Sequence, residues 1–117
     1  MNVIKLLIDI LEKEFTFPVQ KQGSLTDKNA YPESFFTFWL NDTVSEDFFN
    51  NNETKVIWDI DLNFYTCNFE KLNEVFNNAL DILKINGFSL TGYGYDMPVE
   101  NPDYDGRGIR LLYIEQL

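Results

Sequence analysis

The segment from Thr54 to Thr66 carries the clearest periodic pattern in the chain. Apolar residues occupy every second position, and mostly polar residues separate them. The apolar positions are Val56, Trp58, Ile60, Leu62 and Phe64. A period of two places alternate side chains on opposite faces of a β-strand. At about 3.3 Å per residue the strand would span roughly 40 Å, more than a small core requires. We therefore expect a long, half-buried strand that projects at one end as a hairpin arm.

Two other segments have the three- and four-residue spacing of amphipathic helices. Residues 2–14 repeat apolar side chains at this spacing, and so does the segment that follows Asn68, a residue type favoured at helix N-caps. The apolar stripe of the second segment is Phe69, Leu72, Phe76, Ala79, Leu80 and Leu83. Gly87 follows it, where the left-handed conformation that ends many helices favours glycine. We predict two helices, each with one apolar face.

Ser34 to Leu40 reads SFFTFWL, a composition typical of a strand. Because apolar residues fall on both faces, we expect burial on both sides, with a partner subunit as one possible cover. The next thirteen residues, 41–53, include four Asn and four acidic residues. We expect a mobile polar tip there. Its Phe48–Phe49 pair either folds back on its own domain or contacts another protein.

The remaining segments complete a mostly antiparallel sheet. Thr16–Gln20 is predicted as a short strand, and Pro18 favours an edge position or the start of a strand. Phe88–Asp96 is predicted as a strand weakened by two glycines, residues 97–106 as a loop, and Ile109–Ile114 as the closing strand. The order α-β-β-β-α-β-β, without regular βαβ alternation, indicates an α+β fold with two helices on one sheet and a long central hairpin. We expect one domain over residues 1–117.

The charge of the chain limits its partners. Nineteen acidic and nine basic residues give a formal net charge of -10, which disfavours direct binding to nucleic acid or to anionic membranes. The N-terminal apolar run from Val3 to Leu11 is interrupted by Lys5 and Asp9, so we expect no signal peptide, membrane span or lipid anchor. A single Cys, Cys67, is consistent with a reducing cytoplasm. We interpret it as a semi-buried filler.

No motif in the sequence predicts catalysis, a cofactor or a metal site. The chain lacks His, the commonest general base. Gly92–Gly94 begins like a dinucleotide-binding motif but lacks the third glycine and a following helix. Residues 101–106 resemble the first half of a calcium loop, yet Leu112 stands where the bidentate Glu is required. Asp59 and Asp61 are predicted on the wet face of the long strand. We therefore expect that the protein is not an enzyme.

Several stretches together resemble the tail-terminator, or tail-completion, proteins of siphophages and prophages from Gram-positive hosts. The stretches are Gln22–Leu25, Tyr31–Trp39 (YPESFFTFW), Gly92–Asp96 (GYGYD) and Gly106–Gly108 (GRG). Their order and separation fit over nearly the whole chain, and the YPESFFTFW block is the specific part. The resemblance implies one antiparallel sheet with helices against it. It also implies a hexameric ring that caps the tail tube and meets the head-side connector, in a virion assembled in the host cytoplasm.

Within this reading, we predict Phe48, Phe49, Tyr104 and Arg107 as contact residues between proteins. The expected partners are further copies of the chain, the major tail-tube protein and the head–tail connector protein. Two alternatives stay open. One is a head–tail adaptor in a neighbouring ring. The other, from a different class, is an acidic DNA mimic that inhibits a host protein by occupying a basic groove.

Overall fold

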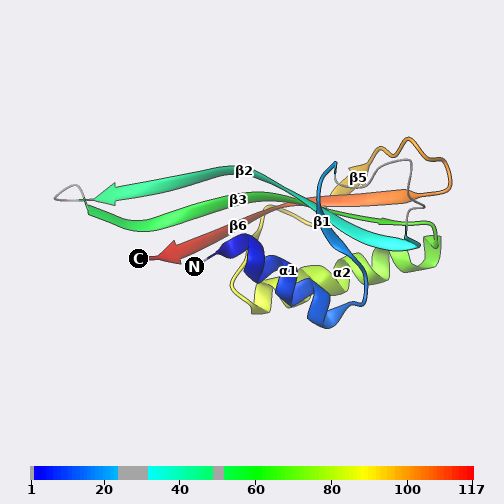
Figure 1. Ribbon diagram of the computed structural model, residues 1–117, viewed down its shortest axis with the longest axis horizontal. Helices are drawn as coiled ribbons and strands as arrows, with labels where there is room; N and C mark the ends of the chain where they lie inside the picture. The colour runs from blue at the N-terminus through cyan, green and yellow to red at the C-terminus, as the bar shows by residue number, and fades with distance from the viewer. Residues whose placement is uncertain (1, 24–31, 49–51) are drawn as a thin grey trace.

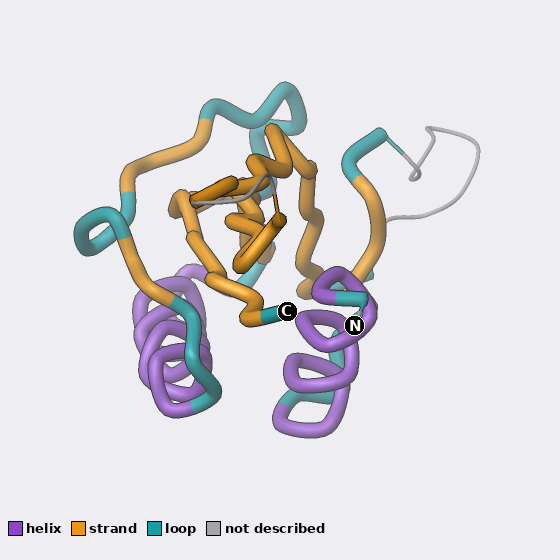
Figure 2. Tube along the Cα trace, turned by 90° about the vertical axis from the view of Figure 1, so that its left-hand side faces the viewer, coloured by secondary structure: helices purple, strands orange, loops and turns teal. Residues whose placement is uncertain are grey.

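The computed structural model describes residues 2–23, 32–48 and 52–117, with the backbone alone at 45–48 and 52–54. Its elements are, in order, α1 (Val3–Glu14), β1 (Val19–Lys21), β2 (Ser34–Phe48), β3 (Asn52–Thr66), α2 (Phe69–Ile85), β4 (Ser89–Leu90), β5 (Tyr95–Met97) and β6 (Asp105–Gln116). Both helices cover the same face of one sheet (Figures 1 and 2). The predicted α+β architecture is thereby confirmed.

The sheet is antiparallel except at one edge. Its strand order is β1-β2-β3-β6-β4, and β5 also pairs with β6. β1 is the exception, because it pairs in parallel with β2. The edge position of β1 agrees with the expectation drawn from Pro18, whose ring leaves no N–H for a ladder hydrogen bond.

Each helix begins at a side-chain cap. Asn2 Oδ1 accepts a hydrogen bond from Lys5 N at 3.1 Å, and Asn68 Oδ1 accepts one from Glu70 N at 3.2 Å. These bonds satisfy N–H groups that have no partner within the helix. After α2, Gly87 has a φ of +96°, as the sequence predicts for the residue that ends this helix.

One position of the predicted α2 stripe is wrong. Leu72 and Phe76 lie in the core, as do Ala79, Leu80 and Leu83. Phe69, however, is 72% exposed. It occupies the first turn of α2, where it lines an open hollow with Cys67 and Tyr104 instead of facing the sheet. Cys67 is exposed as well, so its interpretation as a semi-buried filler is also wrong.

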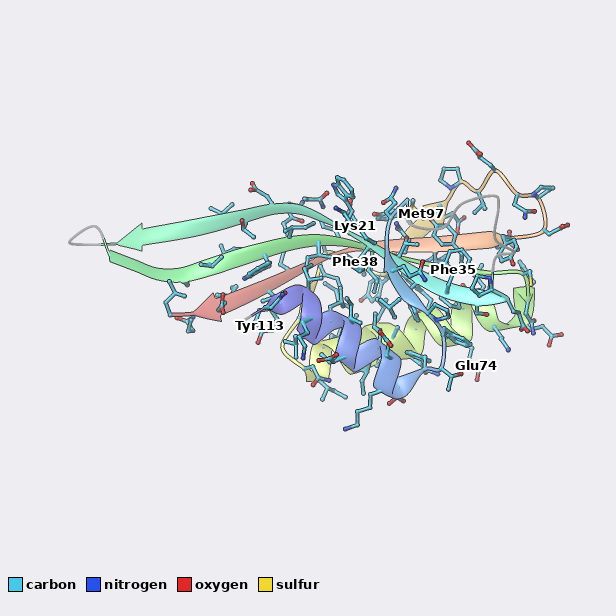
Figure 3. The ribbon with its side chains drawn as sticks, in the orientation of Figure 1. Lys21, Phe35, Phe38, Glu74, Met97 and Tyr113 are labelled. Atoms are coloured by element: carbon cyan, nitrogen blue, oxygen red, sulfur yellow. The ribbon has the colours of Figure 1, made fainter. Side chains whose placement is uncertain are left out.

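The core lies between the helices and one face of the sheet. At its centre Phe36 of β2 packs against Phe64 of β3, with ring centroids 4.8 Å apart, and both side chains are fully buried. Tyr113 of β6 lies on the same side of the sheet (Figure 3), with its ring centroid 4.9 Å from that of Phe88. Fully burying one such ring contributes about 1.5–3 kcal/mol, so these aromatic contacts account for a large part of the stability.

The expected burial of both faces of the SFFTFWL segment holds only for its first part. Phe35, Phe36 and Phe38 are buried, whereas Trp39 and Leu40 are 45% and 38% exposed. β1 pairs with β2 as far as Phe38. Past that residue β2 leaves the covered body, so its last apolar side chains lose their neighbours.

The largest correction concerns the predicted mobile tip at 41–53. β2 continues to Phe48 and β3 begins at Asn52, so most of this segment is paired strand. The register shifts between Leu40 and Asp42, which leaves Asn41 as the extra residue of a bulge. A polar composition indicated a loop here, but an exposed strand also presents polar residues to water. The predicted hairpin arm itself is confirmed.

The C-terminal strands also differ from the expectation. The predicted strand from Phe88 to Asp96 is split into β4 and β5, because Gly92 and Gly94 between them adopt positive φ values of +135° and +97°. The last strand starts at Asp105, four residues before Ile109, and the predicted loop at 97–106 is correspondingly shorter. The sheet therefore has one strand more than predicted.

Candidate interaction surface

A three-stranded arm extends past the helices (Figure 1). We define the arm as residues 39–48 of β2, 52–59 of β3 and 112–116 of β6. The long dimension of the molecule is 54 Å, against 28 and 24 Å across. The C-terminal strand thus joins the predicted hairpin as a third strand. At the base of the arm Trp58 and Tyr113 still pack against the core, and beyond them the strands extend past the helices.

One face of the arm carries an apolar row across all three strands. Val44 of β2 is paired with Ile57 of β3, and Ile57 is paired with Ile114 of β6. Residues directly opposite one another in a sheet point to the same face. Ile57 has the opposite parity to Ile60, which is buried toward the helices, so the row lies on the helix-free face. Val44 and Ile114 are 44% and 50% exposed.

Trp39 extends this apolar surface toward the body of the protein. It lies on the same face of the sheet, one bulge away from Val44, and is paired with Asp61 of β3. The Lys21 ammonium lies 5.3 Å from the centroid of its ring, a cation–π arrangement that leaves much of the ring in water. Exposed apolar side chains gathered on one face of a sheet are typical of protein–protein contact sites.

An ion pair lies at the base of the arm on the same face. Arg110 of β6 donates from Nε to Asp59 Oδ1 at 2.9 Å and from Nη2 to Oδ2, which makes the pair bidentate. Asn41 of the bulge adds a contact to Asp59 Oδ1 at 3.4 Å. The hydrogen bonds from Arg110 hold the pKa of Asp59 below its usual value. Asp59 is therefore a structural anion that fixes β6 to β3.

Both outer edges of the arm are open in the described part of the chain. On one side, β1 pairs with β2 only as far as Phe38, so no described strand pairs with β2 from Trp39 onward. On the other side, β4 pairs with β6 at Leu111 and Leu112, and no described strand follows β6 beyond them. Such edges present backbone N–H and C=O groups that a further strand could pair with.

Tyr104, predicted as a contact residue, has a role within its own chain. Its hydroxyl donates a hydrogen bond to the carbonyl oxygen of Pro32 at 2.8 Å, and its ring centroid lies 6.1 Å from that of Phe35. Burial raises the pKa of the Tyr104 hydroxyl. These contacts tie the loop before β6 to the start of β2. Contact between Tyr104 and another subunit stays a prediction.

Arg107 likewise makes contacts that join elements of its own fold. Its Nη1 lies 2.9 Å from Asp96 Oδ1, its Nη2 donates to the carbonyl oxygen of Tyr93, and its guanidinium lies 5.4 Å from the ring centroid of Phe76. It therefore binds the β4–β5 connection to β6 above α2. A further contact with a neighbouring subunit is untested.

The other two predicted contact residues lie at the end of the arm. Phe48 is the last residue of β2, and only its backbone is described. Phe49 lies outside the described residues. The structure instead draws attention to Val44 and Ile114, which the prediction missed, and to Trp39, which lies in the segment where a partner subunit was considered as a cover. Val44 is the only aliphatic residue between Asn41 and Phe48, a signal that identifies it once that segment is recognised as a strand.

Outside the arm, the described residues form an open hollow beside α2. Among them, no group of three acidic or Cys side chains is placed to hold a metal ion. The hollow beside α2 is open and lined by Glu33, Cys67, Asn68, Phe69, Glu70 and Tyr104. Glu33 is already paired with Lys71 at 3.0 Å, and that hydrogen bond lowers its pKa. The arm is therefore the best candidate for a functional surface.

No known family model matches the chain, and no curated protein matches its sequence. Within residues 2–23, 32–48 and 52–117, no helix combines the length and apolar character needed to cross a membrane.

Proposed function

We propose that this protein is a structural subunit of a siphophage or prophage tail, a tail terminator without catalytic activity. In this proposal its copies form a ring, hexameric as the family resemblance implies, that caps the tail tube and meets the head-side connector. The observation that carries the proposal is the arm, which presents an apolar row and two open strand edges outside the protein's own core.

The arm supports assembly because its features are costly for a protein that stays alone. Monomeric proteins shorten, cover or charge exposed sheet edges, since an open edge recruits other strands. They also rarely expose contiguous apolar surface without a function for it. Here Val44 and Ile114 remain about half exposed at the two outer strands, where contact with another subunit would cover them.

The charge of the chain fits a ring through which DNA passes. Each subunit carries a formal net charge of -10. A channel lined by acidic residues would repel the phosphate backbone and keep the genome from adhering to its wall. The same charge argument applies to a head–tail adaptor, which differs from a tail terminator in the neighbouring rings that it contacts.

The alternative of a DNA mimic receives less support. A mimic needs free carboxylates spaced like phosphates on one face. In the described residues four acidic side chains are instead paired with a cation of the same chain, namely Asp9, Glu33, Asp59 and Asp96. The arm also has no role in mimicry.

The proposal is tested with the purified protein and tail tubes assembled from the tail-tube protein of the same genome. Light scattering after gel filtration counts the subunits, and electron microscopy of the mixture locates the protein. We expect a defined oligomer, alone or on the tubes, and density at one tube end. A protein that stays monomeric at high concentration and leaves tube ends bare contradicts the proposal. Capture of a host DNA-binding enzyme would favour the mimic.

A further inference from the structure

We propose that the two open edges of the arm join neighbouring copies head to tail. In this contact the outer edge of β2, from Trp39 to Phe48, pairs with the outer edge of β6, from Tyr113 to Gln116, of the next copy. The three-stranded arms then merge into one continuous sheet. The inference deepens the proposed function, on which its biological setting rests, by naming the surfaces through which the copies meet.

Strand direction makes this contact geometrically simple. β2 and β6 are both antiparallel to β3, so they run parallel to each other on opposite sides of the arm. A copy rotated about an axis roughly along the strands therefore brings its β2 beside β6 of its neighbour in parallel. Such a contact uses two different surfaces of each copy, and it closes into a ring when the rotation divides a full turn.

Charge selects this pairing over a pairing of like edges. β2 carries Asp42, Glu46 and Asp47 and no basic residue. The β6 edge from Tyr113 to Gln116 has a single acidic residue, Glu115, and no basic one, so the head-to-tail contact sets three acidic residues against one. Two β2 edges would set three acidic residues against three, which is unfavourable for strands about 4.8 Å apart. Two β6 edges would leave the longer edge of β2 open. Only the head-to-tail contact uses both edges.

The apolar row gives the contact its hydrophobic component. The row runs from Val44 on one outer strand to Ile114 on the other. When arms join edge to edge, the Val44 end of one row meets the Ile114 end of the next. Burial of apolar area contributes about 25 cal/mol per Å². The half-exposed side chains at the two ends of the row thus gain cover that neither has in a single copy.

Cross-linking between single cysteines tests the contact. The exposed Cys67 is first replaced by Ser, and Val44→Cys and Ile114→Cys are then made separately, one with an affinity tag that changes its mass. Both variants are treated with a short bis-maleimide, alone and mixed, at high protein concentration and raised ionic strength. Because strands lie about 4.8 Å apart and rise about 3.3 Å per residue, the reagent tolerates a small difference in register.

We expect a linked dimer of mixed mass in the mixture, several-fold more abundant than the linked dimer from either variant alone. A matched Phe69→Cys variant, exposed in the first turn of α2 at the end of the helix away from the arm (Figure 1), measures linkage by random collision. Linkage at that background level in the mixture overturns the inference. So does stronger linkage of Val44→Cys or of Ile114→Cys with itself, because that outcome shows pairing of like edges.

A second set of variants tests the same contact without cross-linking. Val44→Lys and Ile114→Lys should each reduce association measured by sedimentation, because a Lys on an edge strand opposes further pairing. Phe69→Lys makes the same change in charge at the end of α2 away from the arm and should leave association unchanged. Equal effects of all three variants would contradict the inference. If the protein caps tube ends but the Val44→Cys and Ile114→Cys variants do not cross-link, the inference fails and the proposed function stands. If the variants cross-link but the protein leaves tube ends bare, only the proposed function fails.

Discussion

Gly94 packs directly against the ring of Phe76. A Cβ atom added at Gly94 would lie 2.5 Å from Cε2 of Phe76 and 3.0 Å from the carbonyl oxygen of Gly108, and the φ of Gly94 is +97°. Glycine is the residue that accepts both the close approach and the left-handed conformation. This contact lets the connection from β4 to β5 pass tightly over α2, where Arg107 of β6 also meets Phe76.

We therefore expect Gly94→Ala to destabilise the fold strongly. Gly92→Ala provides the control, since Gly92 also has a positive φ but no atom lies within 4 Å of its added Cβ. Both variants strain the backbone, and only Gly94→Ala also creates overlap. Its loss in the free energy of unfolding should exceed that of Gly92→Ala by about 1–3 kcal/mol, the usual cost of overpacking. Urea denaturation measures the difference, and equal losses would show that the contact with Phe76 relaxes freely.

A second prediction separates core from surface on β2. Phe36 is fully buried against Phe64, whereas Trp39 is 45% exposed. Phe36→Ala should lower the free energy of unfolding by about 3–5 kcal/mol, the range for buried aromatic residues. Trp39→Ala should cost far less stability and should weaken association between subunits, because its ring belongs to the helix-free face. A large loss of stability from Trp39→Ala, without an effect on association, would place Trp39 in the core.

The parts of the fold that sequence predicted are those whose pattern has a local physical cause. The alternation around Trp58 and the caps at Asn68 and Gly87 depend on periodicity and on backbone conformations that few residues favour. The strand from Asn41 to Phe48 escaped prediction because its side chains from Asn41 to Val44 are exposed on both faces. A polar strand that pairs with a distant segment has no local signal to distinguish it from a loop.

The candidate surface was predicted less well than the fold. Tyr104 and Arg107 were predicted as contacts between proteins, yet their described contacts hold their own chain together. Val44 and Ile114 are ordinary aliphatic residues, far apart in the sequence. Val44 and Ile114 form one surface because both pair with Ile57 of β3. The sequence alone does not show which strands are neighbours.

A third prediction concerns the dependence of stability on pH. Hydrogen bonds from Arg110 lower the pKa of Asp59, so the charged form of Asp59 is favoured in the folded state. Its contribution is present above the unfolded pKa of about 3.9 and is lost as the pH falls through the lower folded value. Asp59→Asn should reduce stability by about 1 kcal/mol or less at neutral pH.

Denaturation curves of wild type and Asp59→Asn, measured from neutral pH down to about pH 3, should approach each other toward the acidic end. Asp61→Asn removes the same charge two residues away on the same face of β3 and should cost less. A difference between wild type and Asp59→Asn that stays constant over this range would show that the ion pair with Arg110 does not stabilise the fold.

The last prediction decides between two roles for Tyr104. Tyr104→Phe keeps the ring beside Phe35 and removes the hydrogen bond to the carbonyl oxygen of Pro32. We expect a loss of about 0.5–1.5 kcal/mol in the free energy of unfolding and no change in association. Burial raises the pKa of the hydroxyl, so its contribution is present below the unfolded value of about 10 and is lost as the pH rises through the folded value.

Wild type and Tyr104→Phe should therefore differ in stability at neutral pH and converge in strongly alkaline solution. The opposite result, unchanged stability together with weaker binding to tail tubes, would show that Tyr104 acts in contact between proteins and not in the stability of its own chain. The arm would then share its role with the loop before β6, because a hydroxyl that does not stabilise its own chain must act through contact with another.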